Sequence, residues 1–398
     1  MHRVSSLFTA AALCLIAPST AVNLYAAAAD GNVTTLSLTR AANTSYQLSI
    51  TAKTAECESY PSWLGIESKS RTLYCLDRGL SDSVNGSLNS FNMAADGSLT
   101  RIDRVLAPLS GVGADIFMGK HGKKGIMTAS YNRSTAAVFE IDVGGIPGAL
   151  SNALYLKYPV LNATGPVLDR QDRSYLHEVI HDPSRSHLFT PDLGGDRIRV
   201  WNYDPVTLAP LTELAPLVTG SGVGPRHGVF WTSPSTGELF LIFVGELDQN
   251  VHVYRIVTNT AKEVTWEEVF KVPAMGTVQQ ALNAPASEIA LSPDCKYILV
   301  SNREQSFSRH NSSTDTLSTF LINPDGTLTL HQLAPTGGYL PRQFSINKAG
   351  DMVAIGHQVN NTVVVWERDI ESGMIVTEGG PLAQAVLSGN VVMTIWDD

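Results

Sequence analysis

Seven short apolar segments are spaced along the chain, and each ends in polar residues before a second β-rich segment. They begin at Leu24, Leu73, Ile126, Leu188, Leu239, Tyr297 and Met352. Steps of about 50 to 60 residues, with room for several strands in each, match the period of a β-propeller blade. The repeat therefore predicts an all-β fold, a seven-bladed β-propeller of four-stranded antiparallel blades. In such a ring the mouth of the central channel is the place to look for chemistry.

A further recurring segment precedes most of these strands and is expected to form the innermost strand of its blade. Five such segments run into turns rich in Asp, Pro, Ser or Gly, at residues 61–68, 177–183, 225–232, 287–293 and 341–347. The first blade has no such segment upstream, whereas residues 388–396 form a spare strand near the C-terminus. We expect this strand to pair with the N-terminal blade and close the ring, because closure removes exposed sheet edges.

The first 21 residues are typical of a secretory signal peptide. Arg3 supplies a positive start, residues 7–17 an apolar stretch, and residues 19–21 a small-residue cleavage site. The chain is accordingly divided into a leader, residues 1–21, and a single propeller domain, residues 22–398. We expect a secreted, extracellular protein, either free or associated with the cell wall.

Secretion gives meaning to the N-x-[ST] sequons, which are the acceptor sites of N-glycosylation. Each sequon alone is a weak signal in a chain rich in Asn and Ser, but together with the leader they indicate a eukaryotic glycoprotein. The seven sequons are at Asn32, Asn43, Asn85, Asn132, Asn162, Asn311 and Asn360.

Three cysteines remain once Cys14 leaves with the leader. Cys57 and Cys75 lie on either side of a predicted inner strand, a separation that an antiparallel pair can bridge, so a disulfide is favoured over two buried thiols. Cys295 is left over and is predicted to be a free, shielded thiol, because nothing near it in the sequence would activate it as a nucleophile.

Composition and charge limit the classes of partner that the chain is expected to bind. Charged residues make up 16% of the chain and the formal net charge is −9, so there is no basic footprint for nucleic acid or an anionic membrane. Outside the leader, no segment approaches the roughly 18 apolar residues of a membrane span. We therefore expect a monomer that binds a small molecule, with no nucleic-acid partner and no membrane insertion.

The starts of the inner strands and the ends of the strands that follow them share one rim, because the two strands are antiparallel neighbours. Polar side chains predicted at this rim can converge, although about half of them are expected only to satisfy backbone groups at strand ends. They are Asp77, His177, Glu178, Asp192, Arg226, His227, Glu246, Glu288, Arg303, Arg342, His357 and Gln358.

At these positions the sequence resembles the seven-bladed lactonase family that includes bacterial 6-phosphogluconolactonase and fungal 3-carboxy-cis,cis-muconate cyclase. The resemblance covers essentially the whole mature chain, through HEVIHDP, LFTPDLGGDRIRVW, GVGPRHGVF, VGELDQNVHVY, SEIALSPDCKYILVSNR and YLPRQFSINKAGDMVAIGHQ. Together with the leader and the sequons, the resemblance indicates a secreted fungal member, and the likeness to carboxymuconate cyclase implies one His, two Arg and one Glu at the channel mouth. Matched motif by motif, these are His177, Arg226, Glu246 and Arg303, and substrate contacts are expected from His227, Glu288, Arg342 and Gln358.

Two arginines that face one small channel suit a lactone or a dicarboxylate, because guanidinium binds planar oxyanions in a bidentate manner. In lactone hydrolysis, Glu246 or His177 would deprotonate water while the arginines hold the developing oxyanion. In the reverse-type cyclisation, a substrate carboxylate attacks a conjugated alkene and the same residues stabilise charge and deliver a proton to carbon. One His and one carboxylate are a poor set of transition-metal ligands, so we expect neither a metal nor another cofactor.

The alternative is a non-catalytic secreted glycoprotein that serves as a binding or cell-surface module, because a fold alone does not give a function. Such a protein would present the same rim to its partner. Turnover of a panel of lactones and muconates discriminates between the two hypotheses.

Overall fold

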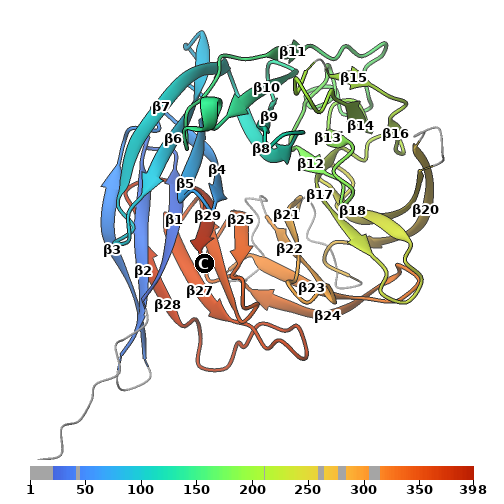
Figure 1. The fold of residues 1–398 in the computed structure, drawn as a ribbon. Coiled ribbons are helices and arrows are strands. Elements are labelled where there is room, and N and C mark those ends of the chain that lie inside the picture. Colours follow the sequence, from blue (N-terminus) through green and yellow to red (C-terminus); the bar gives the residue numbers. More distant parts are fainter. Residues whose placement is uncertain (1–20, 42–44, 210, 259–263, 277–283, 304–313) are drawn as a thin grey trace, which may run out of the picture.

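The structure is a computed structural model and describes residues 21–41, 45–209, 211–258, 264–276, 284–303 and 314–398. Seven antiparallel sheets stand around a central channel (Figure 1), so the predicted seven-bladed, all-β propeller is confirmed. The described residues contain one short 3-10 helix, η1 (Val143–Gly145), and no helix among them is long and apolar enough to cross a membrane.

Each blade is a sheet whose first strand lies at the channel and whose last strand lies outermost. The first three blades are β29 (Val391–Asp397), β1 (Val22–Ala28), β2 (Val33–Arg40) and β3 (Tyr46–Thr54); β4 (Pro61–Glu67), β5 (Thr72–Asp77), β6 (Asn85–Met93) and β7 (Leu99–Pro108); and β8 (Gly111–Met118), β9 (Lys124–Ser130), β10 (Thr135–Ile141) and β11 (Tyr155–Lys157). The fourth is β12 (Ile180–His181), β13 (Leu188–Asp192), β14 (Arg197–Asn202) and β15 (Thr212–Glu213), with β16 (Leu217–Val218) also paired to β14. The last three are β17 (Pro225–Thr232), β18 (Leu239–Gly245), β19 (Asn250–Thr258) and β20 (Val264–Pro273); β21 (Ala286–Leu291), β22 (Tyr297–Asn302), β23 (Thr316–Ile322) and β24 (Leu328–Pro335); and β25 (Pro341–Ile346), β26 (Met352–His357), β27 (Thr362–Glu367) and β28 (Ala383–Val386).

The C-terminal strand closes the ring as predicted. β29 pairs antiparallel with β1, which places Tyr25 opposite Ile395. The indole of Trp396 is buried between the first and last blades and donates a hydrogen bond to the carbonyl oxygen of Ser345, at 3.1 Å. Strand pairing and apolar packing therefore join the two ends of the chain.

The rim of the channel is built from two positions that recur from blade to blade. One is the start of the inner strand, where a β-bulge redirects the adjacent side chain. The bulges fall at Pro61/Trp63, Gly111/Gly113, Pro225/His227, Ala286/Ile289 and Pro341/Gln343. The other position is the first residue after the second strand, which is occupied by Arg78, Tyr131, Glu246 and Arg303.

Two inner strands differ from expectation. β8 had no predicted counterpart, because its glycine-rich start GVGAD lacks the Pro or polar residue that marks the others. The strand predicted over residues 177–183 is reduced to the two residues of β12 and an isolated bridge between Leu176 and Asp192. His177 and Glu178 therefore lie in an irregular segment, which nevertheless occupies the inner-strand position.

The cysteines confirm the predicted pairing and correct one detail. Cys57 and Cys75 form a disulfide with Cα atoms 6.1 Å apart, and Cys295 is free. Cys295 is exposed, not shielded as predicted, because it occupies the left-handed position (φ 57°) of the tight turn before β22 and its side chain projects outward.

Four of the sequons are on exposed asparagines, Asn85, Asn132, Asn162 and Asn360, whereas Asn32 is half-buried. Two others, Asn43 and Asn311, lie outside the described residues. Glycosylation itself stays a prediction.

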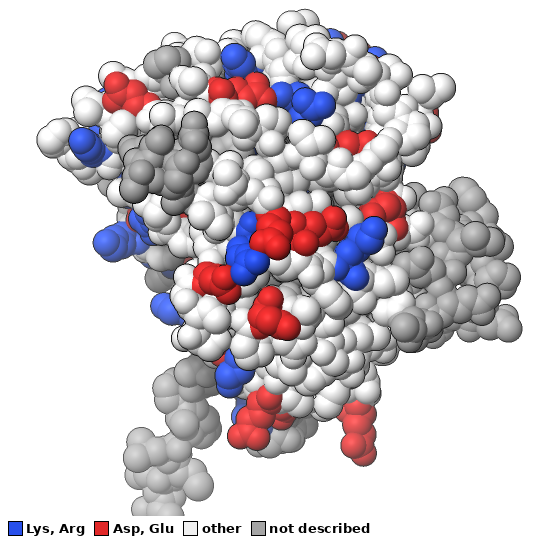
Figure 2. All heavy atoms as spheres, turned by 90° about the vertical axis from the view of Figure 1, so that its right-hand side faces the viewer, with Lys and Arg blue, Asp and Glu red and all other residues white. Residues whose placement is uncertain are grey.

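Charges on the outer wall are mixed. Figure 2 shows one side of the ring, where acidic and basic side chains lie in small interspersed groups, without a continuous basic surface on the described part of this face. The concentration of positive charge described below therefore belongs to the channel mouth and differs from this outer face.

Candidate active site

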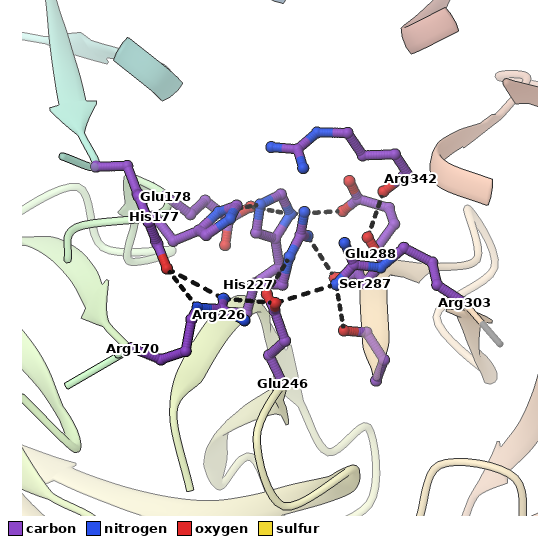
Figure 3. Close-up of polar contacts among 12 residues, drawn as sticks. Arg170, His177, Glu178, Arg226, His227, Glu246, Ser287, Glu288, Arg303 and Arg342 are labelled. Atoms are coloured by element: carbon purple, nitrogen blue, oxygen red, sulfur yellow. Dashed lines mark hydrogen bonds and ion pairs between the residues drawn. The ribbon is translucent and has the colours of Figure 1, made fainter. Parts of the chain in front are cut away.

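Side chains from four consecutive blades converge at one rim of the channel (Figure 3). The structure brings together the four residues implied by the resemblance, His177, Arg226, Glu246 and Arg303, and their catalytic roles stay predictions. Three of the four expected substrate contacts, His227, Glu288 and Arg342, line cavities here, whereas Gln358 lines neither of the two cavities described next.

Two cavities adjoin at this rim, and Arg342 lines both. The arginine cavity, of about 290 Å³, is lined by Arg78, Val112, Tyr131, Asn132, Arg170, His177, Glu246, Arg303 and Arg342. The carboxylate cavity, of about 120 Å³, contains Glu178, Arg226, His227, Glu288 and Arg342 in its wall. The first is large enough for a small organic acid, and the second for a few waters.

Glu246 is enclosed by three arginines. Its carboxylate oxygens lie 2.8 Å from Nη2 of Arg170, 2.9 Å from Nε of Arg226 and 3.3 Å from Nη2 of Arg303. Burial alone would raise the pKa of this carboxyl, but the charges of Arg303, Arg226 and Arg170 together hold the pKa far below its ordinary value. Glu246 is therefore an ionised anchor for the arginines and a weak proton acceptor, so His177 is the better suited of the two bases predicted for water.

Arg170 was missed by sequence reasoning. It comes from the connection between β11 and β12, where no strand pattern marks a residue as facing the channel. Its Nε and Nη2 also donate to the hydroxyl oxygen of Tyr131, at 3.2 and 3.1 Å, so one guanidinium group links Tyr131 to Glu246.

A chain of hydrogen bonds runs from the arginine cavity to the carboxylate cavity. Nδ1 of His177 lies 3.0 Å from Nε2 of His227, and Nδ1 of His227 lies 3.0 Å from Oε1 of Glu288. Because the carboxylate accepts from Nδ1–H of His227, Nε2 of that ring is the acceptor and Nδ1–H of His177 is the donor. This tautomer leaves Nε2 of His177 with its lone pair, and that atom makes no hydrogen bond with the described residues.

Both rings of this chain are neutral near pH 7. Burial lowers the pKa of His177 well below its ordinary value, and the charge of Arg226 lowers it further. Burial also lowers the pKa of His227, although the charge of Glu288 opposes this. Nε2 of His177 is therefore available as a base over the whole neutral range.

Glu178 and Glu288 flank His227 from two sides. Oε1 of Glu178 lies 3.6 Å from Nδ1 of His227, and its Oε2 accepts a hydrogen bond from the Gly228 N–H at 2.8 Å. Burial, followed by the charge of Glu288, raises the pKa of Glu178 well above its ordinary value. Burial and this neighbouring charge therefore favour the protonated form of Glu178.

The same trio has the spacing of a metal-ligand set. One ligand atom from each of Glu178, His227 and Glu288 lies within 4.8 Å of the others. In the described part of the chain, this is the one group of three His, Cys, Asp or Glu side chains close enough together to hold a metal ion. The prediction of no metal did not consider it. Arg226 lines the same cavity and its charge acts on Glu178, so a divalent cation bound here would lie beside a guanidinium group that repels it.

The fold and this site define a seven-bladed propeller with a polar, arginine-rich channel mouth. The family profile "Lactonase, 7-bladed beta-propeller" matches residues 20–386, and the protein therefore belongs to this family. Among its relatives, a probable 6-phosphogluconolactonase of Arthroderma benhamiae is 26% identical over 327 residues, which cover 80% of this chain and 76% of the relative. A 6-phosphogluconolactonase of Serratia proteamaculans is 28% identical over 292 residues, which cover 72% of this chain and 76% of the relative.

Solved structures show the same fold. A putative 6-phosphogluconolactonase of Bacteroides fragilis has a TM-score of 0.75 and 23% identity, over 96% of this chain and 100% of the other. A periplasmic gluconolactonase of Pseudomonas aeruginosa also has a TM-score of 0.75 and 23% identity, over 95% of this chain and 99% of the other.

Proposed function

We propose that this protein hydrolyses the ring ester of a small lactone that carries an anionic group, with His177 as the general base. The observation that carries the proposal is the hydrogen-bonded chain from His177 through His227 to Glu288, which presents, at the edge of an arginine-lined cavity, an imidazole nitrogen that bonds to no described residue. The names of the relatives, 6-phosphogluconolactonase and gluconolactonase, support the reaction class.

His177 activates the attacking water. As the water oxygen bonds to the lactone carbonyl carbon, a water proton moves to Nε2 of His177. The resulting imidazolium donates from Nδ1 to His227, which in turn donates to Glu288, so the buried carboxylate stabilises the positive charge through His227. This is the logic of a carboxylate–histidine pair in a hydrolase triad, extended by one ring.

Arg303 stabilises the negative charge that develops on the carbonyl oxygen. It lines the arginine cavity with His177, and its buried Nε has no hydrogen-bond partner among the described residues. Arg226 helps to fix the Glu246 carboxylate that Arg303 contacts. It pairs with Glu246 and donates from Nη1 to the Ser287 carbonyl oxygen at 2.7 Å. A fixed cation at this place lowers the barrier without reorganisation during the reaction.

Collapse of the tetrahedral intermediate completes the reaction. The bond between the carbonyl carbon and the ring oxygen breaks, and the leaving alkoxide takes the proton from Nε2 of His177. The product is the open-chain hydroxy acid, and the base is regenerated in its starting tautomer. Every proton transferred is accounted for by water and His177.

Ring closure of a carboxymuconate would use the same groups in the opposite sense, with His177 as proton donor to carbon. No observation at the site favours closure over hydrolysis, so the muconates serve as a second arm of the same assay. A purely binding role is the third outcome, in which ligands bind the rim and none is converted.

The experiment is a pH-stat assay of the purified protein against δ-gluconolactone, its 6-phosphate, a carboxylated γ-lactone and cis,cis-muconates, corrected for spontaneous hydrolysis. Acceleration of ring opening for at least one anionic lactone is expected. Activity should survive EDTA, because water activation is assigned to His177. Absence of turnover across the panel, together with tight binding of any member, would replace the enzyme by the binding module.

We also propose that the protein is secreted and acts as a monomer. Residues 1–21 and the exposed sequons support export. Expression in a eukaryotic host, followed by mass spectrometry of the medium fraction before and after enzymatic deglycosylation, tests this. A protein that stays inside the cell with residues 1–21 uncleaved would contradict it.

A further inference from the structure

We propose that Arg78 and Arg342 form a separate oxyanion subsite in the arginine cavity, which binds a phosphate or carboxylate group at the end of the ligand remote from the lactone ester. The assignment of that group to a lactone rests on the proposed function. The subsite itself rests on an imbalance of charge within the cavity and on the way these two side chains are held.

Among the described residues, the cavity has more positive charge than its carboxylate can compensate. Four guanidinium groups of this part of the chain line it, against the one carboxylate of Glu246. Arg170 and Arg303 contact Glu246, whereas Arg78 and Arg342 form no ion pair with any described residue. The net charge of the whole chain is −9, so this local excess of positive charge is opposite to the overall balance.

Arg342 faces the cavity. The bulge between Pro341 and Gln343 turns its side chain into the channel, and its guanidinium makes no hydrogen bond with the described residues. Figure 3 shows this group extended across the site, apart from the contacts around Glu246. Burial, and then the charge of Arg303, lowers the pKa of Arg342 to about 10, so the group is still charged at neutral pH.

Arg78 is held in a way that spares its hydrogen-bond donors. Its guanidinium lies over the ring of Tyr60, with the central carbon 5.0 Å from the ring centroid. Stacking of this kind orients the group through its face and leaves its N–H donors in the plane for another acceptor. Arg78 follows β5 at the position that Glu246 and Arg303 occupy in their own blades, so it faces the same channel.

Two guanidinium groups in one cavity, neither in an ion pair with a described residue, repel each other unless an anion joins them. Each can donate two parallel hydrogen bonds to an oxyanion, which is the geometry that phosphate and carboxylate groups match. Because Arg303 and His177 lie on the wall near Glu246, a ligand that spans the cavity can place its ester there and its anion between Arg78 and Arg342.

Binding of hydroxy-acid products tests the subsite without turnover. Calorimetric titration of the full mature chain at pH 7 and constant ionic strength would compare gluconate with two analogues that add one anion at the far end, glucarate and 6-phosphogluconate. The added anion should tighten binding about tenfold or more. In Arg78→Gln and Arg342→Gln this gain, measured against gluconate on the same variant, should be lost. Arg255→Gln, which alters a half-buried, ion-paired arginine on β19 away from the channel mouth, is the matched control.

The pattern across the three acids identifies the group. A gain for 6-phosphogluconate alone assigns a phosphate, a gain for glucarate alone assigns a carboxylate, and a gain for both assigns either. Equal binding of all three acids by the wild type, or a gain that persists in both arginine variants, would overturn the subsite. Melting temperatures show whether each variant is folded. The comparison of the three acids on the wild-type protein tests the subsite even if a variant does not fold. A gain in a protein that hydrolyses no lactone would sustain the subsite and refute the proposed function alone.

Discussion

Replacing Glu246 by Gln tests the claim that this residue anchors the arginines. The substitution leaves Arg170, Arg226 and Arg303 packed around a neutral amide, with their mutual repulsion no longer compensated. Removing one partner from a buried ion pair costs about 3–5 kcal/mol. Unfolding entropy of about 2.1 cal/mol/K per residue over about 380 residues converts this cost into a fall of roughly 4–6 °C in Tm at pH 7. Differential scanning calorimetry measures it directly.

The pH dependence of this loss has a definite sign. The pKa of Glu246 is lower in the folded protein than in the unfolded chain, so its stabilisation is complete above the unfolded value of about 4.3 and is lost as the pH falls. The difference in Tm between wild type and Glu246→Gln should therefore be constant from pH 8 to pH 6 and narrow between about pH 5 and pH 3.5.

Glu267→Gln is the matched control. Glu267 pairs with Arg255 on the outer part of a blade, and its side chain is 64% exposed, so its loss should cost less than about 1 kcal/mol and move Tm by about 1 °C at most. A Glu246→Gln variant that melts with the wild type at pH 7, or a difference that widens in acid, would refute the anchoring role.

Three further predictions concern the relay, the ring and the thiols. Glu288→Gln and His227→Asn should each lower kcat by about ten- to a hundredfold with little change in KM, because they act on the base and not on the substrate; a rise in KM alone would contradict the relay. Deletion from Asn390 onward should abolish recovery of folded protein, since it removes β29 and opens the ring; a soluble, cooperatively melting truncation would disprove closure by this strand. Thiol titration of the denatured, unreduced protein should find one reactive group, Cys295, and three groups would contradict the disulfide.

The sequence predicted the ring because propeller strands carry their own signals. Alternating apolar residues mark the second and third strands of each blade, and the missing inner strand at the N-terminus required the spare strand before Trp396. The start of β8 was missed because glycines at Gly111 and Gly113 give a bulge with no polar mark. Sequence patterns therefore predicted the strands that alternate regularly between apolar and polar residues. They missed the inner strand whose start is shaped by glycine geometry.

The candidate site was predicted only in part. His177, Arg226, Glu246 and Arg303 could be placed on one rim because they begin or follow strands. Arg170 was not predictable, since the course of a long connection depends on tertiary packing. Nor was the anchoring role of Glu246, because its pKa is set by arginines from other segments of the chain.

Arg78 could have been found from the sequence. It immediately follows Asp77, at the same strand-end position as Glu246 and Arg303. The prediction placed Asp77 at the rim instead. In the structure Asp77 accepts hydrogen bonds from the N–H groups of Tyr60 and Gly79 and holds a turn. The channel-facing residue is the one that follows the strand.

The most direct test of the central claim is the pH–rate profile of lactone hydrolysis by the wild type and by His177→Asn. Because the pKa of His177 is lowered, kcat/KM of the wild type should be flat through neutral pH and fall only in acid, below the ordinary histidine value of about 6.5. The His177→Asn variant should lose about a hundredfold or more in rate while remaining folded. Full turnover by this variant, or no acceleration of any lactone by the wild type, would contradict the account.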